Sequence, residues 1–280
     1  MCPLWVDNGG RAMNLTVPDL TIACMIVSCV IAFGLPILLA LYFHKKKGEF
    51  IPMIVGIAVM FVFVFTLEAA VNQTIFKSTI GETIRNNKVL YAVYGGLMAA
   101  VFEECGRWIA YRTILKNRMG NDSNALMYGV GHGGCEAIMI VGFMMLNYIT
   151  ISIMMNKGTI GDTLSQLDST TLAKMQLAMQ TLSTTPSYVF LLSGVERISA
   201  LMAQVSLSVL VWFAVKFKHK RYFFLALLFH FVMDAGTVLL RSQIESIILV
   251  EVFIFVVAAI IVFVAYNVWC HFYLTMTVKK

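Results

Sequence analysis

The sequence has few charged residues, and this scarcity argues against a soluble fold. Charged residues make up 13% of the 280 residues and hydrophobic residues 59%, whereas a soluble domain carries roughly 25% charged residues. The charges also cluster, so the stretch from Leu20 to Phe43 contains none. A helix of about 20 apolar residues crosses the bilayer core. Composition therefore predicts an integral membrane protein with no room for a second, soluble domain.

Cysteine pairs, internal repeats and a cleavable signal are missing as well. None of the six cysteines forms a CxxC pair, and most lie in predicted membrane helices, which argues against a disulfide framework or a thiolate metal site. The polar amino terminus lacks the basic start of a signal peptide. The net charge of +6 is explained by topology, because the basic residues lie between apolar segments. We therefore expect no nucleic-acid partner.

The apolar segments predict an all-α fold, a polytopic bundle of about seven transmembrane helices forming a single domain over residues 1–280. Lysine and arginine are denser after the first, third and fifth helices and at the carboxyl terminus. Such loops are cytoplasmic, so we expect the N-terminus outside and the C-terminus inside. The outer loop 156–185 has apolar residues every three to four positions, which predicts an amphipathic surface helix or a solvated loop helix. The predicted spans are 20–43, 50–72, 88–112, 123–155, 187–215, 222–240 and 246–272.

Ionisable residues within the predicted helices are the candidates for function, because charges are costly inside a bilayer. Glu104, His132 and His230 each lie eight or nine residues from the cytoplasmic end of a helix. At 1.5 Å per residue, all three are roughly 12–14 Å inside that face. Agreement in depth among three helices favours one assembled site.

Spacing adds two carboxylates to this layer. His132 and Glu136 are four residues apart, as are His230 and Asp234. Residues at this spacing share a helix face. Each helix is therefore expected to project an imidazole and, one turn deeper, a carboxylate in the same direction.

Two arginines lie beside further acids. Glu103 and Arg107 are four residues apart, so Arg107 is expected to neutralise one acid, while Glu104 is rotated about 100° from Glu103. Glu196 and Arg197 are adjacent and point about 100° apart. We expect these two to pair with other helices and not with each other.

These residue types suggest hydrolysis. Two imidazoles and a carboxylate are the usual ligands of a catalytic zinc ion, which activates water while a second carboxylate transfers the proton. The HExxH spacing is absent, and a metal-free route is open in which a glutamate activates water while histidine and aspartate stabilise the oxyanion. Gly129 and Gly133 beside His132 form a GxxxG pair, which allows close approach of helices.

The order EExxR, GxGHGGxE and HxxxD on successive membrane helices resembles the YhfC-type intramembrane metalloproteases, a group similar to the PrsW and CAAX-processing (CPBP) membrane proteases. The resemblance implies a metal-dependent or glutamate-type peptidase that cleaves a membrane-associated or membrane-spanning peptide. The sequence departs from the CAAX-type pattern in the spacing between the glutamates and Arg107. It also has Asp234 where the CAAX type has asparagine. Both differences argue against prenylated substrates. The implied catalytic residues are Glu103, Glu104, Arg107, Glu136 and Asp234, and the implied zinc ligands are His132, His230 and Glu104.

A proton-coupled transporter and a catalytically silent membrane adaptor are the alternative functions. Transporter sites lie near the midplane, often within an internal repeat, whereas this layer lies to one side and no repeat is found. These features favour a peptidase, with water reaching the site from the cytoplasmic side. The expected setting is a bacterial plasma membrane, with lipid and a membrane-embedded peptide or protein substrate as partners.

Overall fold

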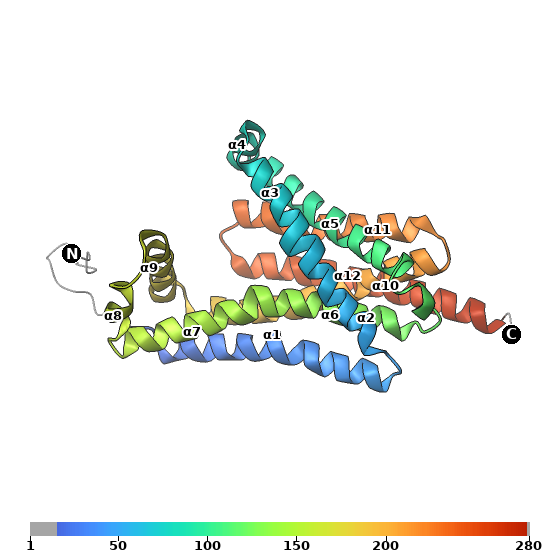
Figure 1. Cartoon of the computed structure of the whole chain (residues 1–280), viewed down its shortest axis with the longest axis horizontal. Helices are drawn as coiled ribbons and strands as arrows, with labels where there is room; N and C mark the ends of the chain where they lie inside the picture. Colours follow the sequence, from blue (N-terminus) through green and yellow to red (C-terminus); the bar gives the residue numbers. More distant parts are fainter. Residues whose placement is uncertain (1–15, 279–280) are drawn as a thin grey trace. The chain divides into compact units, whose positions relative to one another are not determined.

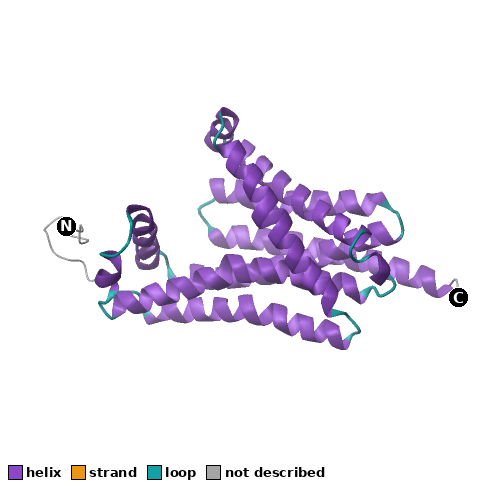
Figure 2. Cartoon of the chain, in the orientation of Figure 1, coloured by secondary structure: helices purple, strands orange, loops and turns teal. Residues whose placement is uncertain are grey.

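A computed structural model describes residues 16–278 of the protein, and every regular element in this range is a helix (Figures 1 and 2). Within it, seven helices are long and apolar enough to cross a membrane. The predicted polytopic α-helical membrane fold is thus confirmed, although its orientation stays a prediction and residues 1–15 are outside the described range. The spans are Asp19–Lys45 (α1), Phe50–Phe76 (α2, η1 and α3), Lys88–Arg112 (α5), Ser123–Asn156 (α6, η3 and α7), Ser187–Lys216 (α10), Lys220–Gln243 (α11) and Ile247–Leu274 within Ile247–Val278 (α12).

Local signals fix where several helices begin and end. The side chain of Asn87 caps α5 by accepting hydrogen bonds from the backbone N–H groups of Val89 at 3.0 Å and Leu90 at 3.1 Å. Such caps satisfy donors that the first turn leaves free. Beyond the basic ends of α1 and α10, Lys47 and Lys218 adopt positive φ angles of 73° and 58°. These left-handed residues turn the chain out of each helix.

Two of the spans contain π-helical stretches, and shorter helices lie between the spans. The sequence analysis did not predict α4, which Ser78 caps by accepting from the N–H of Gly81 at 3.3 Å. The complete bounds of these segments are α2 Phe50–Val59, η1 Met60–Glu68, α3 Ala69–Phe76, α4 Thr79–Asn86, η2 Lys116–Arg118, α6 Ser123–Ala137, η3 Ile138–Gly142, α7 Phe143–Asn156, α8 Ile160–Leu164 and α9 Ser169–Thr184.

The chain divides into two compact units, one containing residues up to 32 together with 139–195, and the other containing 33–138 together with the residues from 196 onward. Every predicted site residue belongs to the second unit. The expectation of a single domain over the whole chain stays a prediction.

In the first unit, α7 packs against α9, and Met145 and Leu182 are buried in its apolar core. Asn156 at the end of α7 accepts from the N–H of Val17 at 2.7 Å. Asp168 caps α9 and accepts from the hydroxyl of Thr171 at 2.6 Å. That hydrogen bond holds the pKa of Asp168 below its usual value. A helix does form within the stretch predicted to contain one, while its place on the membrane surface stays a prediction.

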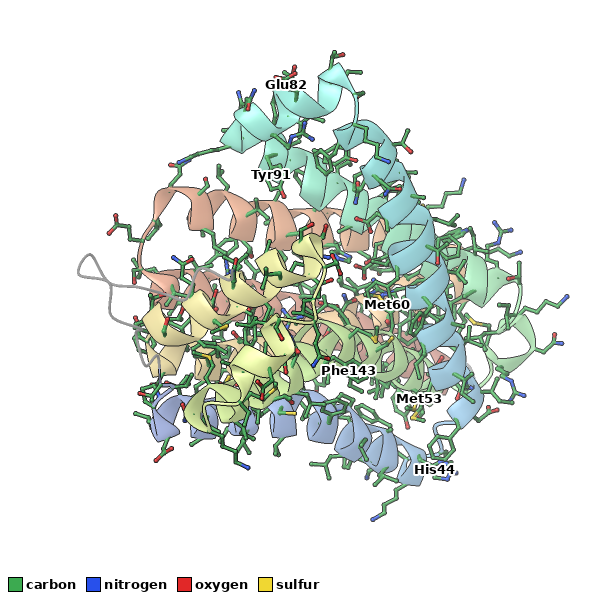
Figure 3. The ribbon with its side chains drawn as sticks, turned by 60° about the vertical axis from the view of Figure 1, so that its left-hand side comes forward. His44, Met53, Met60, Glu82, Tyr91 and Phe143 are labelled. Carbon is green, nitrogen blue, oxygen red and sulfur yellow. The ribbon has the colours of Figure 1, made fainter. Side chains whose placement is uncertain are left out.

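In the second unit, α5 packs along α11, and α2 packs along α6. Met53 and Met60 mark the course of the α2 span, and Glu82 lies beyond it on α4 (Figure 3). A Cβ atom on Gly131 of α6 would meet the backbone carbonyl of Met53, and one on Gly129 would lie 2.5 Å from Cα of Val205 on α10. Glycines thus let α6 approach both neighbours at backbone distance, which fixes the position of the neighbouring His132.

We expect Gly131→Ala to destabilise the protein by about 1–3 kcal/mol, because a side chain there forces α2 and α6 apart. The matched control is Gly34→Ala on α1, where an added Cβ meets nothing within 4 Å. Its stability should be unchanged or slightly raised, because alanine is the better helix former. Denaturation by SDS, followed by circular dichroism, measures both. Equal stability of the two variants would contradict close backbone packing at Gly131.

Candidate functional site

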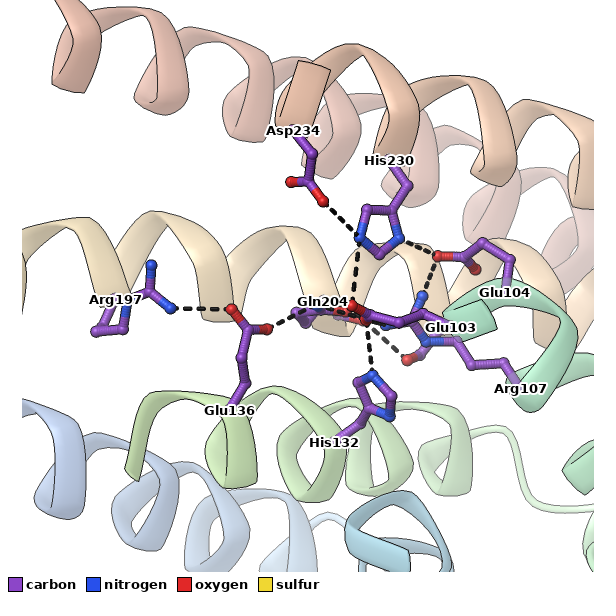
Figure 4. A network of polar contacts seen from close by, with 10 residues as sticks. Glu103, Glu104, Arg107, His132, Glu136, Arg197, Gln204, His230 and Asp234 are labelled. Carbon is purple, nitrogen blue, oxygen red and sulfur yellow. Dashed lines mark hydrogen bonds and ion pairs between the residues drawn. The ribbon is translucent and has the colours of Figure 1, made fainter. Parts of the chain in front are cut away.

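Glu103 on α5 lies between histidines from two other helices (Figure 4). Its Oε2 atom accepts from Nε2 of His132 on α6 at 2.8 Å, and its Oε1 atom lies 3.7 Å from Nε2 of His230 on α11. Because a carboxylate only accepts, the proton of the His132 ring is on Nε2. Nδ1 of His132 is buried and has no hydrogen-bond partner among the described residues. Three residues predicted from the sequence therefore meet at one carboxylate.

Glu104 lies on the other side of His230. Its Oε1 atom accepts from Nδ1 of His230 at 2.6 Å and pairs with Nη1 of Arg107. Nη2 of Arg107 also lies 3.4 Å from Oε2 of Glu103, so Arg107 serves both acids. The predicted ligand set combined Glu104 with both imidazoles, whereas the carboxylate that faces Nε2 of both His132 and His230 is Glu103. Of the imidazole nitrogens, Glu104 contacts only Nδ1 of His230 in the described part of the chain.

Asp234 is one turn beyond His230 on α11. Its Oδ2 atom lies 3.4 Å from Nε2 of His230, so the predicted pairing of these residues is present in the geometry. The Asp234 side chain is 33% exposed, far more than the acids on α5. It is therefore the most exposed member of the group.

Gln204 on α10 was missed by the sequence analysis. Its Nε2 donates to Oε2 of Glu103 at 3.0 Å and to Oε2 of Glu136 at 2.7 Å, while its Oε1 accepts from Arg107. The amide thus joins the α5 acids to the α6 acid. The predicted site was chosen from ionisable residues, so it did not include Gln204. An amide within a long apolar helix is nevertheless a signal of a buried polar network.

Arg197 on α10 holds Glu136 in place. Its Nη1 lies 2.9 Å from Oε1 of Glu136, and its Nη2 lies 2.5 Å from Oε1 of Glu196. The expectation that the adjacent pair cannot interact was therefore wrong, since both side chains are long enough to curl toward each other. Glu196 also contacts Arg241 at 3.2 Å, and Arg241 reaches Glu251 of α12 at 3.5 Å.

The centre of this network is buried and carries unbalanced charge. The side chain of Glu104 is fully buried and that of Glu103 is 7% exposed. Around the histidines, the three carboxylates of Glu103, Glu104 and Asp234 face one guanidinium, that of Arg107. With neutral imidazoles the group has a net charge of −2. Such an imbalance is costly at low dielectric, and protons on both imidazoles or a divalent cation would neutralise it.

A divalent metal ion fits this group in donor type and in charge. Imidazole nitrogens and carboxylates are the ligands that zinc takes in catalytic sites. The side chains are joined to one another by hydrogen bonds and ion pairs, and no three His, Cys, Asp or Glu side chains within residues 16–278 are arranged as a ligand set. Zinc and its ligands stay predictions.

These features define a polytopic α-helical membrane protein with a buried ionic centre built from four of its spans. Its sequence matches the family described as YhfC intramembrane metalloprotease over residues 31–254. It is also 35% identical over 240 residues to the uncharacterized membrane protein YhfC of Bacillus subtilis (strain 168), a match covering 85% of this chain and 92% of that protein. No solved structure matches. The chain belongs to the YhfC family, as the motif order indicated.

Proposed function

We propose that the protein is an intramembrane peptidase that uses a divalent metal ion, with Glu103 as the base that takes a proton from water. The observation that carries the proposal is the position of Glu103, whose carboxylate faces Nε2 of both His132 and His230. Water bound next to both imidazoles would lie beside this carboxylate. The family description supports the same class of reaction.

The metal would be held by Nε2 of His132 and of His230, with Asp234 as the carboxylate beside His230. Bound there, it would supply Lewis-acid activation of water. To act as a ligand through Nε2, His132 would carry its ring proton on Nδ1 instead, the neutral tautomer that leaves the Nε2 lone pair free. Glu104 accepts at Nδ1 of His230, which fixes the ring and leaves its Nε2 toward Asp234 and Glu103.

Arg107 and Gln204 hold the base in position. Arg107 lies 3.4 Å from Glu103, and Gln204 donates to the same Oε2 atom at 3.0 Å. Both contacts favour the ionised carboxylate before it accepts a proton. The fixed donors mean that little reorganisation is needed when charge moves during the reaction.

The test combines metal analysis with peptide release by purified protein in proteoliposomes. The probes are single-span peptides carrying a quenched fluorophore pair on either side of the apolar segment. We expect about one metal ion per chain, removed by a chelator, and fluorescence that rises only in the metal-loaded protein. His132→Ala and His230→Ala should each lose the metal and the cleavage together.

Glu245→Gln, which alters an exposed acid between α11 and α12, is the matched control and should keep both properties. Cleavage that continues unchanged in His132→Ala without bound metal would overturn the metal-dependent reaction. If the protein binds metal but releases no fluorophore from any probe, the assignment of the metal ligands stands and the choice of single-span peptides as substrates is wrong.

A further inference from the structure

A cavity of about 290 Å³ lies beside the buried centre, within the second unit. It is bordered by α5, α6, α10, α11 and α12, and both Glu136 and Asp234 line it. Asp234 connects the cavity to His230, and Glu136 connects it through Gln204 to Glu103. The cavity therefore adjoins the proposed reaction centre on two sides.

The cavity lies on the side of the centre away from the basic loops. Thr237 and Val238 line it near the end of α11 at Gln243, whereas α11 begins with its basic residues at Lys220. Beyond the cavity, Arg241 bridges Glu196 and Glu251. Exposure rises in the same direction, from the fully buried Glu104 to Asp234 and then to the half-exposed Arg241.

On the opposite side, aromatic residues separate the centre from the basic loops. Tyr111 is one turn beyond Arg107, and its ring lies 4.7 Å from that of Tyr128 and 5.1 Å from that of Trp212, between centroids. All three rings are fully buried, as is Leu115. A layer of closely packed, fully buried side chains has no room for water. The expected access of water from the basic, cytoplasmic side therefore meets a packed barrier.

The lining of the cavity combines apolar side chains, among them Met233 and Ile254, with charged side chains whose formal charges sum to a negative value. It presents the carboxylates of Glu136, Glu196 and Asp234 and the single guanidinium of Arg197. Arg197 is 8% exposed, and its Nε is buried with no hydrogen-bond partner in the part of the chain that the structure describes. A buried donor of this kind is normally satisfied by water or by another acceptor, such as a peptide carbonyl. The cavity thus has the features of a hydrated site that attracts cations.

We propose that this cavity is the route by which water and peptide reach Glu103, that it opens at the end of the bundle opposite the basic loops, and that its acidic lining favours positively charged groups. Its use by a peptide rests on the proposed function, whereas its opening and charge preference do not. A substrate would carry a lysine, an arginine or a free α-amino group near the cleaved bond.

The test is thiol labelling of Thr237→Cys in a background with the six native cysteines replaced by serine or alanine. Two membrane-impermeant methanethiosulfonates are added to either side of sealed vesicles, one carrying trimethylammonium and the other sulfonate. Glu245→Cys, beyond α11, and Lys116→Cys, at the basic end, are exposed reporters of sidedness. Leu115→Cys, within the barrier, should not react from either side.

We expect Thr237→Cys to react from the side that labels Glu245→Cys. The cationic reagent should be favoured over the anionic one on the order of 10-fold relative to free cysteine, because the lining concentrates cations. Adding Glu196→Gln should reduce this preference. Val238→Cys is a second site if Thr237→Cys fails to give a monodisperse protein.

Reaction from the Lys116 side, preference for the anion, or no reaction at either folded site would overturn the proposal. Labelling does not require catalysis, so its outcome is separate from that of the peptidase test. Cleavage that continues in His132→Ala without bound metal, together with labelling as expected, would reject the metal-dependent peptidase and retain the cavity. Metal-dependent cleavage together with labelling from the Lys116 side would support the peptidase and reject the proposed route.

Discussion

Glu103→Gln is expected to lower the rate of peptide release by about 10²–10⁴-fold, the usual contribution of a positioned acid or base, while the protein keeps its metal ion. The amide has nearly the same shape as the carboxylate, so the imidazoles of His132 and His230 should keep the positions from which they would hold the metal. The amide cannot take the proton of an attacking water. If the variant keeps its metal but loses cleavage, Glu103 acts as a base and not as a ligand. Glutamine is chosen over alanine because it makes this distinction without changing the shape of the side chain.

The experiment measures single-turnover peptide release and metal content in the same reconstituted samples. Asp234→Asn is the informative comparison, because the proposal makes Asp234 a ligand and so predicts reduced metal occupancy for that variant. If Glu103→Gln loses the metal together with cleavage, Glu103 is a ligand and not the base. If it cleaves at the rate of the unaltered protein, the proposed mechanism is wrong.

The membrane fold could be predicted from the sequence because hydrophobic length is a direct consequence of bilayer thickness. The predicted spans 88–112 and 123–155 differ from the observed helices by no more than one residue at either end. Which end of the bundle faces the cytoplasm cannot be read from the helix bounds, so the predicted orientation stays a prediction. The short helix α4 was missed because eight residues give too little periodicity to distinguish a helix from a polar loop.

The members of the centre could be predicted in part from depth and spacing. Depth placed Glu104, His132 and His230 in one layer, and the spacing of four residues brought in Asp234. What spacing could not determine is which α5 acid faces both imidazoles. Glu103 and Glu104 are adjacent, and the choice depends on how α5 is rotated against α6 and α11, which packing alone sets.

Other features of the centre depend on contacts between helices that are distant in sequence. Gln204 joins Glu103 to Glu136 across α5, α10 and α6, and nothing in the local sequence of α10 indicates those partners. The local sequence likewise does not indicate that Arg197 pairs with Glu136. The aromatic barrier is a further example, because it forms only when the buried side chains of several helices meet. These contacts are the basis for the proposed access to the centre from the end opposite the basic loops.

Arg107→Ala is expected to destabilise the protein by about 3–5 kcal/mol, the usual cost of removing one partner from a buried ion pair. The guanidinium is fully buried and contacts Glu103, Glu104 and Gln204. Its removal leaves two buried carboxylates without a counter-charge. SDS denaturation in mixed micelles, followed by circular dichroism, measures the loss.

Two further variants show whether the loss of stability in Arg107→Ala comes from breaking a buried ion pair. Arg118→Ala removes a pair with Glu49 in which both side chains are about one-third exposed, so it should cost no more than about 1 kcal/mol. Arg107→Met combined with Glu104→Leu replaces the most buried pair with apolar groups and should recover much of the lost stability, because well-packed apolar residues often equal a buried ion pair. Recovery of stability without recovery of cleavage would mean that the pair is retained for the reaction and not for folding. If Arg107→Ala costs no more than Arg118→Ala, the role of Arg107 as the buried counter-charge of Glu103 and Glu104 would be wrong.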